Sequence, residues 1–174
     1  MENVDIYNCR REKTGKIKER HSLENGEYRI SAHIWIIDKD NRLLIQKRAL
    51  TEKKFPGKWS QTGGGVIAGE TSLETVKRET KEELNVKVNN DEIYYIGSYT
   101  RIRDIVDVWL VEKNIDFNEI KLQEEEVAEA KFVTFEEFDK MIEEGMVVPS
   151  INPSYMLVKN YFCNFKDNKN AIKF

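Results

Sequence analysis

Apolar and polar residues alternate along residues 29–37, the first strongly patterned segment of the chain. Four apolar residues fall on one side of an extended backbone: Ile30, Ala32, Ile34 and Ile36. This two-residue period predicts a β-strand. A polar turn at residues 38–41 and a second strand over residues 43–47 follow, so we expect a hairpin. The charged stretch from Arg48 to the Pro56-Gly57 pair predicts a loop.

A helical pattern replaces the strand pattern after Gly63-Gly64-Gly65, which we interpret as a backbone-permissive turn. Thr71 and Glu74 match a capping box, in which each side chain accepts a hydrogen bond from the free backbone N–H of the other residue. Apolar residues recur on one face up to Leu84, and Asn85 can adopt the left-handed conformation that ends a helix. The pattern therefore predicts a helix from about Thr71 to Leu84.

The second half of the chain returns to strands and then to helices. Residues 93–99 and 106–111 are rich in β-branched and aromatic residues, which predicts a strand pair around the polar residues 100–104. Phe132-Val133 predicts one more strand, before the helices that end the chain.

Two helices are expected after this strand. A second capping box, Thr134 to Glu137, predicts a helix that ends at Gly145. Asn152 and Pro153 are typical of an N-cap and a first helical residue, so a last helix should reach about Phe165. We expect the final residues, 166–174, to be loose.

This order of elements predicts one α/β domain of the α+β type, with a mixed sheet between helices. The length of 174 residues is near the commonest size of a single domain, and 40% hydrophobic residues is ordinary for a globular chain. We therefore expect one domain over residues 1–174, with a polar N-terminal extension at about 1–27 and a C-terminal helix at about 153–165.

Composition and charge exclude several classes of protein. A formal net charge of −3 gives no basic surface of the kind that nucleic-acid binding requires, so no nucleic-acid partner is expected. Cys9 and Cys163 lack the spacing of a disulfide scaffold or a zinc site. No run approaches the roughly 20 apolar residues of a membrane span, and the charged N-terminus does not match a signal peptide. We expect a cytoplasmic protein without membrane association.

The most informative residues lie on the first predicted helix. Glu79, Glu82 and Glu83 stand at i, i+3 and i+4, which places three carboxylates on one helix face. On an exposed helix this pattern is usually a solvated face. Here the mutual repulsion of the carboxylates favours a bound hard cation, Mg²⁺ or alternatively Mn²⁺. Arg78 can reach Glu82 at i+4.

The spacing of this region resembles the Nudix box. Gly64, five residues, Glu70, seven residues, Arg78-Glu79, two residues and Glu82-Glu83 follow the motif. The similarity extends over roughly residues 31–138, which is most of the chain. It implies a Nudix-like α/β/α sandwich. Two positions depart from the usual motif and neither changes a ligand: Thr80 replaces an aliphatic residue, and Asn85 replaces a glycine.

The resemblance also implies a reaction and roles for named residues. Glu79 and Glu83 would be the main metal ligands, Glu82 would assist, and the backbone carbonyl of Gly63 would complete the inner sphere. Arg78 would orient the glutamates. Attack of a metal-activated water on phosphorus would then cleave a nucleoside diphosphate linked to another moiety, or a related small-molecule diphosphate.

The general base and the substrate contacts remain open. Glu79 competes as the base with the run Glu124-Glu125-Glu126, of which Glu126 is the candidate. Basic residues predict the phosphate-binding side of the pocket: Arg48, Lys53 and Arg101, with Lys54 and Arg103. Three aromatic residues are candidates for stacking on a nucleobase, although large aromatic residues more often belong to the hydrophobic core: Trp35, Tyr99 and Trp109. His33 lies in a strand and is interpreted as structural.

Two alternatives stay beside the hydrolase. The layout of the N-terminal half also resembles the isopentenyl-diphosphate isomerase branch of the family. That enzyme needs a cysteine after the strand at Trp59 and has histidines among its metal ligands. This chain has Gln-Thr-Gly-Gly-Gly, residues 61–65, in place of the cysteine segment, and Arg29 where a ligand histidine is expected. A non-catalytic nucleotide-binding regulatory module is the second alternative. The resemblance also implies that the chain could pair as a homodimer, which is common among relatives.

Overall fold

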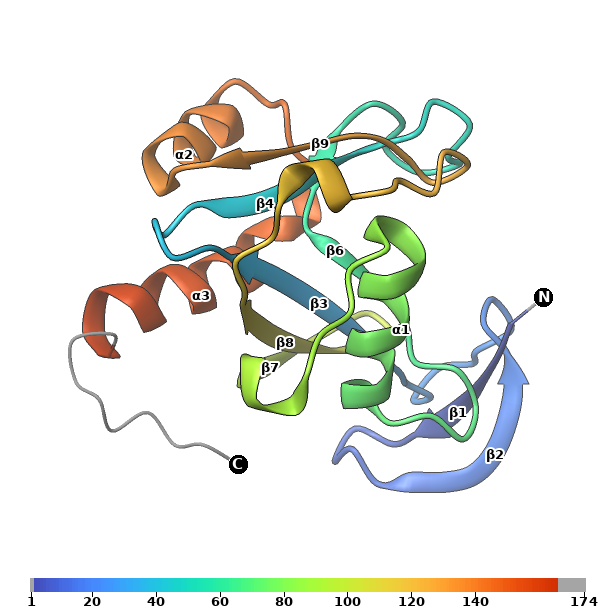
Figure 1. The fold of residues 1–174 in the computed structure, drawn as a ribbon. Helices are drawn as coiled ribbons and strands as arrows, with labels where there is room; N and C mark the ends of the chain where they lie inside the picture. Colours follow the sequence, from blue (N-terminus) through green and yellow to red (C-terminus); the bar gives the residue numbers. More distant parts are fainter. Residues whose placement is uncertain (1, 166–174) are drawn as a thin grey trace.

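The computed structural model describes residues 2–165 and contains a mixed β-sheet of seven strands (Figure 1). Five strands lie in the order β5-β4-β3-β8-β7; β6 pairs with β3, and β9 pairs with β4. β3 and β8 are parallel, whereas every other pairing in this sheet is antiparallel. The strands are β3 (Arg29–Ile37), β4 (Leu43–Arg48), β5 (Trp59–Ser60), β6 (Thr62–Gly65), β7 (Ile93–Arg101), β8 (Asp104–Glu112) and β9 (Val127–Val133).

Helices cover both faces of this sheet, which confirms the α/β/α sandwich. They are α1 (Ser72–Leu84), α2 (Phe135–Glu143) and α3 (Asn152–Phe165), with short 3₁₀ helices at Asn90–Glu92, Phe117–Glu119 and Pro149–Ile151. Side chains alternate along β3 as predicted. Ile34 packs toward Val76 of α1, whereas Trp35 packs on the other face, 5.5 Å between ring centroids from Tyr155 of α3. α1 and α3 therefore lie on opposite faces (Figure 1).

The caps of α1 follow the prediction. The Glu74 N–H donates to Thr71 Oγ1 at 3.2 Å, and the Thr71 N–H donates to Glu74 Oε2 at 2.7 Å. Asn85 ends the helix with φ 59°. Thr80 is buried and donates from Oγ1 to the Val76 carbonyl at 2.6 Å, so its hydroxyl group is satisfied inside the core.

Three sequence predictions are wrong in detail. Gly63-Gly64-Gly65 is not a turn: these residues form most of β6, and none of them has a positive φ. The turn between β7 and β8 is shorter than expected, because the strands leave only residues 102 and 103 between them. Asn152 is not an N-cap, because it has helical dihedrals and continues directly from the 3₁₀ helix before it.

The N-terminal extension is also more ordered than expected. β1 (Asn3–Tyr7) and β2 (Lys13–Glu19) form an antiparallel hairpin, which we call the N-terminal hairpin. Its turn residue Arg11 donates to both oxygens of the buried Asp107 of β8, each at 2.6 Å. The hairpin therefore docks on the main sheet through a bidentate ion pair, a strongly directional contact.

The predicted loose segment, residues 166–174, lies outside the residues that the structure describes. Between residues 2 and 165, no helix is long and apolar enough to cross a membrane.

Candidate active site

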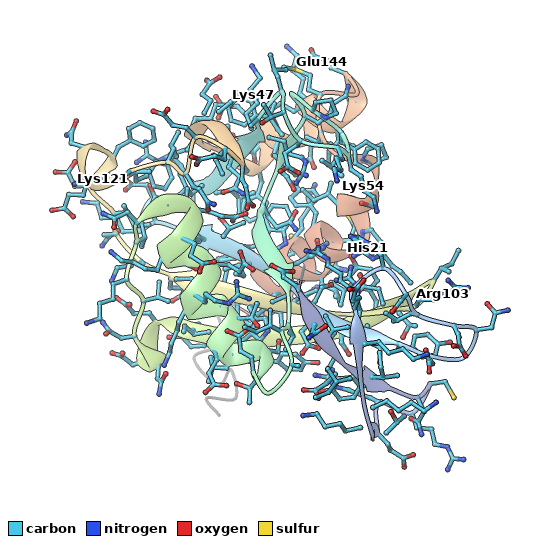
Figure 2. All side chains as sticks on the ribbon, turned by 90° about the vertical axis from the view of Figure 1, so that its right-hand side faces the viewer. His21, Lys47, Lys54, Arg103, Lys121 and Glu144 are labelled. Atoms are coloured by element: carbon cyan, nitrogen blue, oxygen red, sulfur yellow. The ribbon has the colours of Figure 1, made fainter. Side chains whose placement is uncertain are left out.

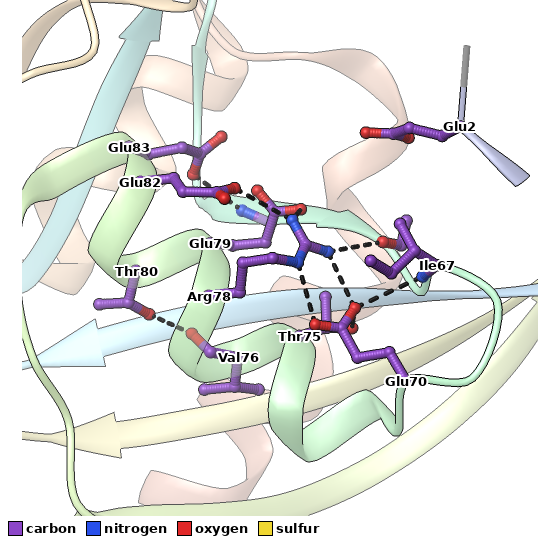
Figure 3. Close-up of polar contacts among 12 residues, drawn as sticks. Glu2, Ile67, Glu70, Thr75, Val76, Arg78, Glu79, Thr80, Glu82 and Glu83 are labelled. Atoms are coloured by element: carbon purple, nitrogen blue, oxygen red, sulfur yellow. Dashed lines mark hydrogen bonds and ion pairs between the residues drawn. The ribbon is translucent and has the colours of Figure 1, made fainter. Parts of the chain in front are cut away.

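The buried carboxylates of α1 lie against strand β6. Glu79 and Glu83 are 8% and 5% exposed, and they project from the same side of α1 as Glu82 (Figure 3). Glu83 Oε2 accepts a hydrogen bond from the Gly63 N–H at 3.2 Å. Burial, then the neighbouring Glu79 carboxylate, raise the pKa of Glu83 well above its ordinary value. Burial also raises the pKa of Glu79.

Glycine at position 64 makes this approach possible. A Cβ atom there would lie 1.8 Å from Glu79 Oε1, far inside van der Waals contact. At Gly63, a Cβ atom would lie 2.4 Å from the Ala32 carbonyl oxygen of the paired strand. Both glycines are therefore required by close approach and not by backbone dihedrals, and this explains a glycine-rich strand beside the helix.

Arg78 holds the carboxylates of this region in place (Figure 3). It donates to Glu79 Oε1 at 2.7 Å and to Glu82 Oε2 at 3.1 Å, as the i+4 spacing predicts. It also donates to both oxygens of Glu70, at 2.9 and 3.0 Å, and to the Gly65 carbonyl oxygen at 3.0 Å. Glu70 therefore anchors the Arg78 guanidinium. The sequence alone did not assign this role, although Glu70 belongs to the motif.

Glu82 differs from the two buried glutamates, because its side chain is 52% exposed and is held at the helix surface by Arg78. Among residues 2–165, no three acidic, histidine or cysteine side chains form a ready metal-binding group. Mg²⁺ does not require such a cage, because it keeps several waters and is commonly held by one or two carboxylates together with substrate phosphates.

The chemistry of the donor set fits a divalent cation. Within the described residues, Glu83 makes no ion pair with a lysine or arginine. A buried, uncompensated carboxylate beside a second one is costly, and a hard cation offsets that cost. Glu79, Glu83 and a backbone oxygen of β6 are therefore suitable ligands.

A cavity of about 670 Å³ opens beside these carboxylates and is lined by Glu83, Gly63 and Gly64. Of the predicted phosphate-binding residues, Arg48, Lys54, Arg101 and Arg103 line it and Lys53 does not. Three further basic residues line the cavity that the sequence did not identify as candidates: Arg20, His21 and Arg29. Figure 2 shows His21, Lys54 and Arg103 on the same side of the molecule.

The aromatic candidates for base stacking are not in this cavity. Trp35 is fully buried in the core, and Trp109 donates from Nε1 to Ser72 Oγ at 2.7 Å, beside α1. Tyr99 packs edge-on against His33. The aromatic side chain that lines the cavity is Phe55, which is 44% exposed in the loop after β4. Because Phe55 lies in a long charged loop without hydrophobic periodicity, the sequence did not predict its place in the cavity.

His33 lines the cavity but is held as a structural residue. Its Nδ1 lies 3.0 Å from Ser154 Oγ, and burial lowers its pKa to about 3. The imidazole is therefore neutral at physiological pH, in agreement with the structural interpretation.

Glu126 is the member of the acidic run that interacts with the buried carboxylates. Its charge contributes to the raised pKa of both Glu79 and Glu83. Partial burial, followed by the neighbouring Glu52, raises the pKa of Glu126 itself. The N–H of Gln123 donates to the Glu83 carbonyl oxygen at 3.1 Å, which ties this loop to the end of α1.

Comparison with known proteins agrees with this geometry. Residues 27–150 match the family model described as "NUDIX domain". An uncharacterized Nudix hydrolase of Listeria monocytogenes is 34% identical over 151 residues, which cover 86% of this chain and 89% of that protein. An isopentenyl-diphosphate isomerase of Escherichia coli is 28% identical over a shorter stretch, 59% of this chain and 58% of that protein.

Solved structures show the same fold. A structure from Deinococcus radiodurans superposes with a TM-score of 0.73, at 22% identity, over 91% of this chain and 98% of that one. The NUDIX domain of Shewanella oneidensis NrtR, solved with ADP ribose, gives a TM-score of 0.64 at 13% identity, over 83% and 94%. The match to the family model over residues 27–150 and the relative from Listeria monocytogenes show that the chain belongs to the Nudix family of hydrolases, which cleave phosphoanhydride bonds in nucleoside diphosphate derivatives.

Proposed function

We propose that this chain hydrolyses a nucleoside diphosphate linked to a further moiety, with Mg²⁺ held by Glu79, Glu83 and the backbone carbonyl of Gly63. The observation that carries the proposal is Glu83, a carboxylate that is 5% exposed, has no cationic partner among the described residues and lines a basic cavity. In a strand, the N–H and C=O of one residue point to the same edge, so the Gly63 carbonyl faces the side to which its N–H donates.

Each residue of the site then has a physical task. When bound, Mg²⁺ would neutralise charge on the phosphoryl oxygens and lower the pKa of a water molecule. Arg78 fixes the positions of Glu79 and Glu82, while Glu70 fixes Arg78. Arg48 at the cavity wall would contact substrate phosphates; its guanidinium is positioned by the Lys54 carbonyl at 2.8 Å.

We assign Glu126 as the general base in preference to Glu79. Glu79 is occupied by Arg78 and, as a ligand, would have no free proton-accepting role. Glu126 lies in a loop next to the carboxylates and has a raised pKa, which brings a carboxylate closer to the pKa that suits a base near neutral pH.

A pH profile tests this assignment. Activity should rise with pH through the pKa of Glu126, and Glu126→Gln should lower kcat by about 10²- to 10⁴-fold and remove that limb of the profile. Glu125→Gln, from the same loop, is the matched control and should keep it. If the pH profile of Glu126→Gln kept its acid limb, the role of general base would fall to Glu79.

The reaction itself is tested with a substrate panel. Purified protein with Mg²⁺ is incubated with nucleoside triphosphates, nucleotide sugars, ADP-ribose, dinucleoside polyphosphates and isopentenyl diphosphate, and the products are identified by mass spectrometry. Incorporation of one oxygen from ¹⁸O-labelled water into a phosphate product is expected. Isomerised isopentenyl diphosphate without such incorporation would contradict the proposal.

A further inference from the structure

Two arginines from different parts of the chain lie together at one end of the cavity. Arg20 directly follows strand β2, and Arg29 begins strand β3. A Cβ atom built on Gly65 would lie 3.0 Å from Arg29 Nη1 and 3.8 Å from Arg20 Nε, so both guanidinium groups rest on the same point of β6. With Arg101, the last residue of β7, and Arg103 of the β7–β8 turn, they form what we call the arginine end of the cavity.

Hydrogen-bonding capacity at the arginine end is left unused. Arg20 Nε and Arg29 Nη1 are buried and have no hydrogen-bond partner within residues 2–165. One buried acceptor beside them, Asp104 Oδ1, is in the same situation. Buried polar atoms without partners are uncommon in folded proteins, because each one costs free energy. Two such donors and one such acceptor, on residues that line one end of the cavity, indicate a group that supplies the missing partners.

The charges of this end are also unbalanced. Four guanidinium groups face two carboxylates, those of Asp104 and Glu2: Asp104 pairs with Arg101 and more distantly with Arg29, and Glu2 pairs with Arg20 at 3.0 Å. The four guanidinium groups and two carboxylates therefore have a net charge of +2, and Arg103 donates only to a neutral group, Asn25 Oδ1, at 2.8 Å. Burial, and then the repulsion of Arg20 and Arg101, lowers the pKa of Arg29, whereas the Asp104 carboxylate acts in the opposite direction. A phosphate monoester, which carries about −1.5 to −2 at neutral pH, matches this excess in charge and in its number of acceptor oxygens.

The arginine end is separate from the scissile diphosphate. Gly63 lies at the carboxylates, whereas the Arg29 guanidinium lies against Gly65, two residues further along β6. At about 3.3 Å per residue, this corresponds to roughly 7 Å along β6. Neighbouring phosphorus atoms of a diphosphate are closer than that, so the arginine end is placed for a phosphate group beyond the diphosphate at the carboxylates.

From this arrangement we propose that Arg20 and Arg29 form a second anion subsite, which binds a phosphate group on the moiety linked to the nucleoside diphosphate. Asp104 Oδ1 accepts a hydrogen bond from a hydroxyl group of that moiety. The substrate class is thus a nucleoside diphosphate derivative with an additional phosphate, held roughly 7 Å along β6 from the carboxylates. This inference rests on the proposed function, which it narrows.

The N-terminal hairpin gives the subsite its specificity. The family model matches residues 27–150, so Arg20 is contributed by a segment outside the matched region. The Arg11 pair with Asp107 fixes the hairpin on β8, and the Ala68 N–H donates to the Asn3 carbonyl oxygen at 2.8 Å. Arg20 is therefore held by a docked element and can act as a specificity-determining residue.

Phosphate binding in the absence of metal tests the subsite independently of catalysis. Inorganic phosphate is titrated into the whole protein in EDTA and followed by calorimetry. Arg20→Gln and Arg29→Lys should each weaken binding about tenfold or more, since each removes a charge-assisted contact or its fork geometry. Arg10→Gln, from the exposed hairpin turn, is the matched control and should bind as the wild type does.

The outcomes separate the subsite from the active site. Glu83→Gln should keep phosphate binding while hydrolysis is lost, so a protein that hydrolyses nothing can still support the subsite. Equal binding by wild type and Arg20→Gln would overturn the proposal, as would loss of binding in Arg48→Gln alone. In the second stage, wild type should prefer a nucleotide substrate with the extra phosphate over its unphosphorylated counterpart, and Arg20→Gln should reduce that ratio of kcat/KM about tenfold.

Discussion

The two ends of the cavity carry opposite charges and are built in different ways. The carboxylate end, formed by Gly63, Gly64, Glu79 and Glu83, comes from one continuous stretch in which β6 leads into α1. The arginine end is assembled from the segment after β2, the start of β3 and the β7–β8 turn. A local motif thus supplies the cleavage chemistry, while contacts distant in sequence supply substrate recognition.

Both ends hold like charges that the protein itself leaves incompletely neutralised. At the carboxylate end, the missing partner would be a cation; at the arginine end, it would be an anion. Sites that bind charged ligands commonly hold charge in unfavourable surroundings, because the ligand then relieves that cost. The following changes separate the two ends experimentally.

Glu83→Gln should have the largest effect. Removal of a proposed metal ligand should lower kcat/KM by about 10²- to 10³-fold, which corresponds to roughly 3 to 4 kcal/mol of transition-state stabilisation. Steady-state kinetics on the best substrate of the panel measures it, with Glu125→Gln as an exposed control. If Glu83→Gln kept more than a third of the wild-type rate, the carboxylate end would not be the catalytic centre.

Arg11→Ala should strongly destabilise the protein, because it leaves the fully buried Asp107 without its bidentate partner. Breaking a buried ion pair in this way lowers the free energy of unfolding by about 3 kcal/mol. Because the Arg11 side chain is 39% exposed, we expect a smaller loss of about 2 kcal/mol. Urea unfolding measures the change, and Arg10→Ala is the control. A difference below about 0.5 kcal/mol would show that the hairpin is not anchored by this pair.

Two glycine substitutions compare the ends directly. Gly64→Ala introduces a Cβ atom 1.8 Å from the present position of Glu79 Oε1, so it should displace that carboxylate and lower kcat about 10- to 100-fold. Gly65→Ala places its Cβ atom 3.0 Å from Arg29 Nη1 and should mainly weaken phosphate binding. Identical kinetic and binding defects in both variants would mean that the ends are not independent.

The smallest effect expected is a pH dependence of the N-terminal hairpin. The Glu24 N–H, followed by Lys18, holds the pKa of Glu27 at about 2, below its ordinary value of 4.5. Because the folded pKa is lowered, this stabilisation is present above pH 4.5 and is lost as the pH falls toward 2. Thermal midpoints of wild type and Glu27→Gln should therefore differ at pH 6 and converge near pH 2; a constant difference would contradict this.

The sequence was sufficient where the signal is local. Alternation along β3, the capping boxes at Thr71 and Thr134, and the spacing from Gly64 to Glu83 each lie within one element or two adjoining elements, so short-range patterns describe them. The order of those elements predicted a mixed sheet between helices, and the resemblance to the Nudix family implied the α/β/α sandwich. The residue of the motif that received no role, Glu70, holds Arg78 and accepts a hydrogen bond from Thr75, and spacing alone does not reveal these contacts.

The rest depends on contacts that no local pattern encodes. Strand β2 is almost entirely exposed, so it has no apolar face to mark it, and the N-terminal hairpin was missed. Glycine is depleted in strands, which made Gly63-Gly64-Gly65 resemble a turn. Arg20 meets Arg29 only because the N-terminal hairpin docks beside β3, and Lys54 rather than Lys53 lines the cavity because of the loop conformation.

Metal binding by the buried glutamates is the central claim, and Mn²⁺ titration followed by electron paramagnetic resonance tests it most directly. Wild-type protein should bind Mn²⁺, Mg²⁺ should displace it, and Glu83→Gln should weaken the binding at least about tenfold, whereas Arg20→Gln should leave it unchanged. Equal Mn²⁺ affinity in wild type and Glu83→Gln would contradict the account, because the cation would then be held elsewhere than between α1 and β6.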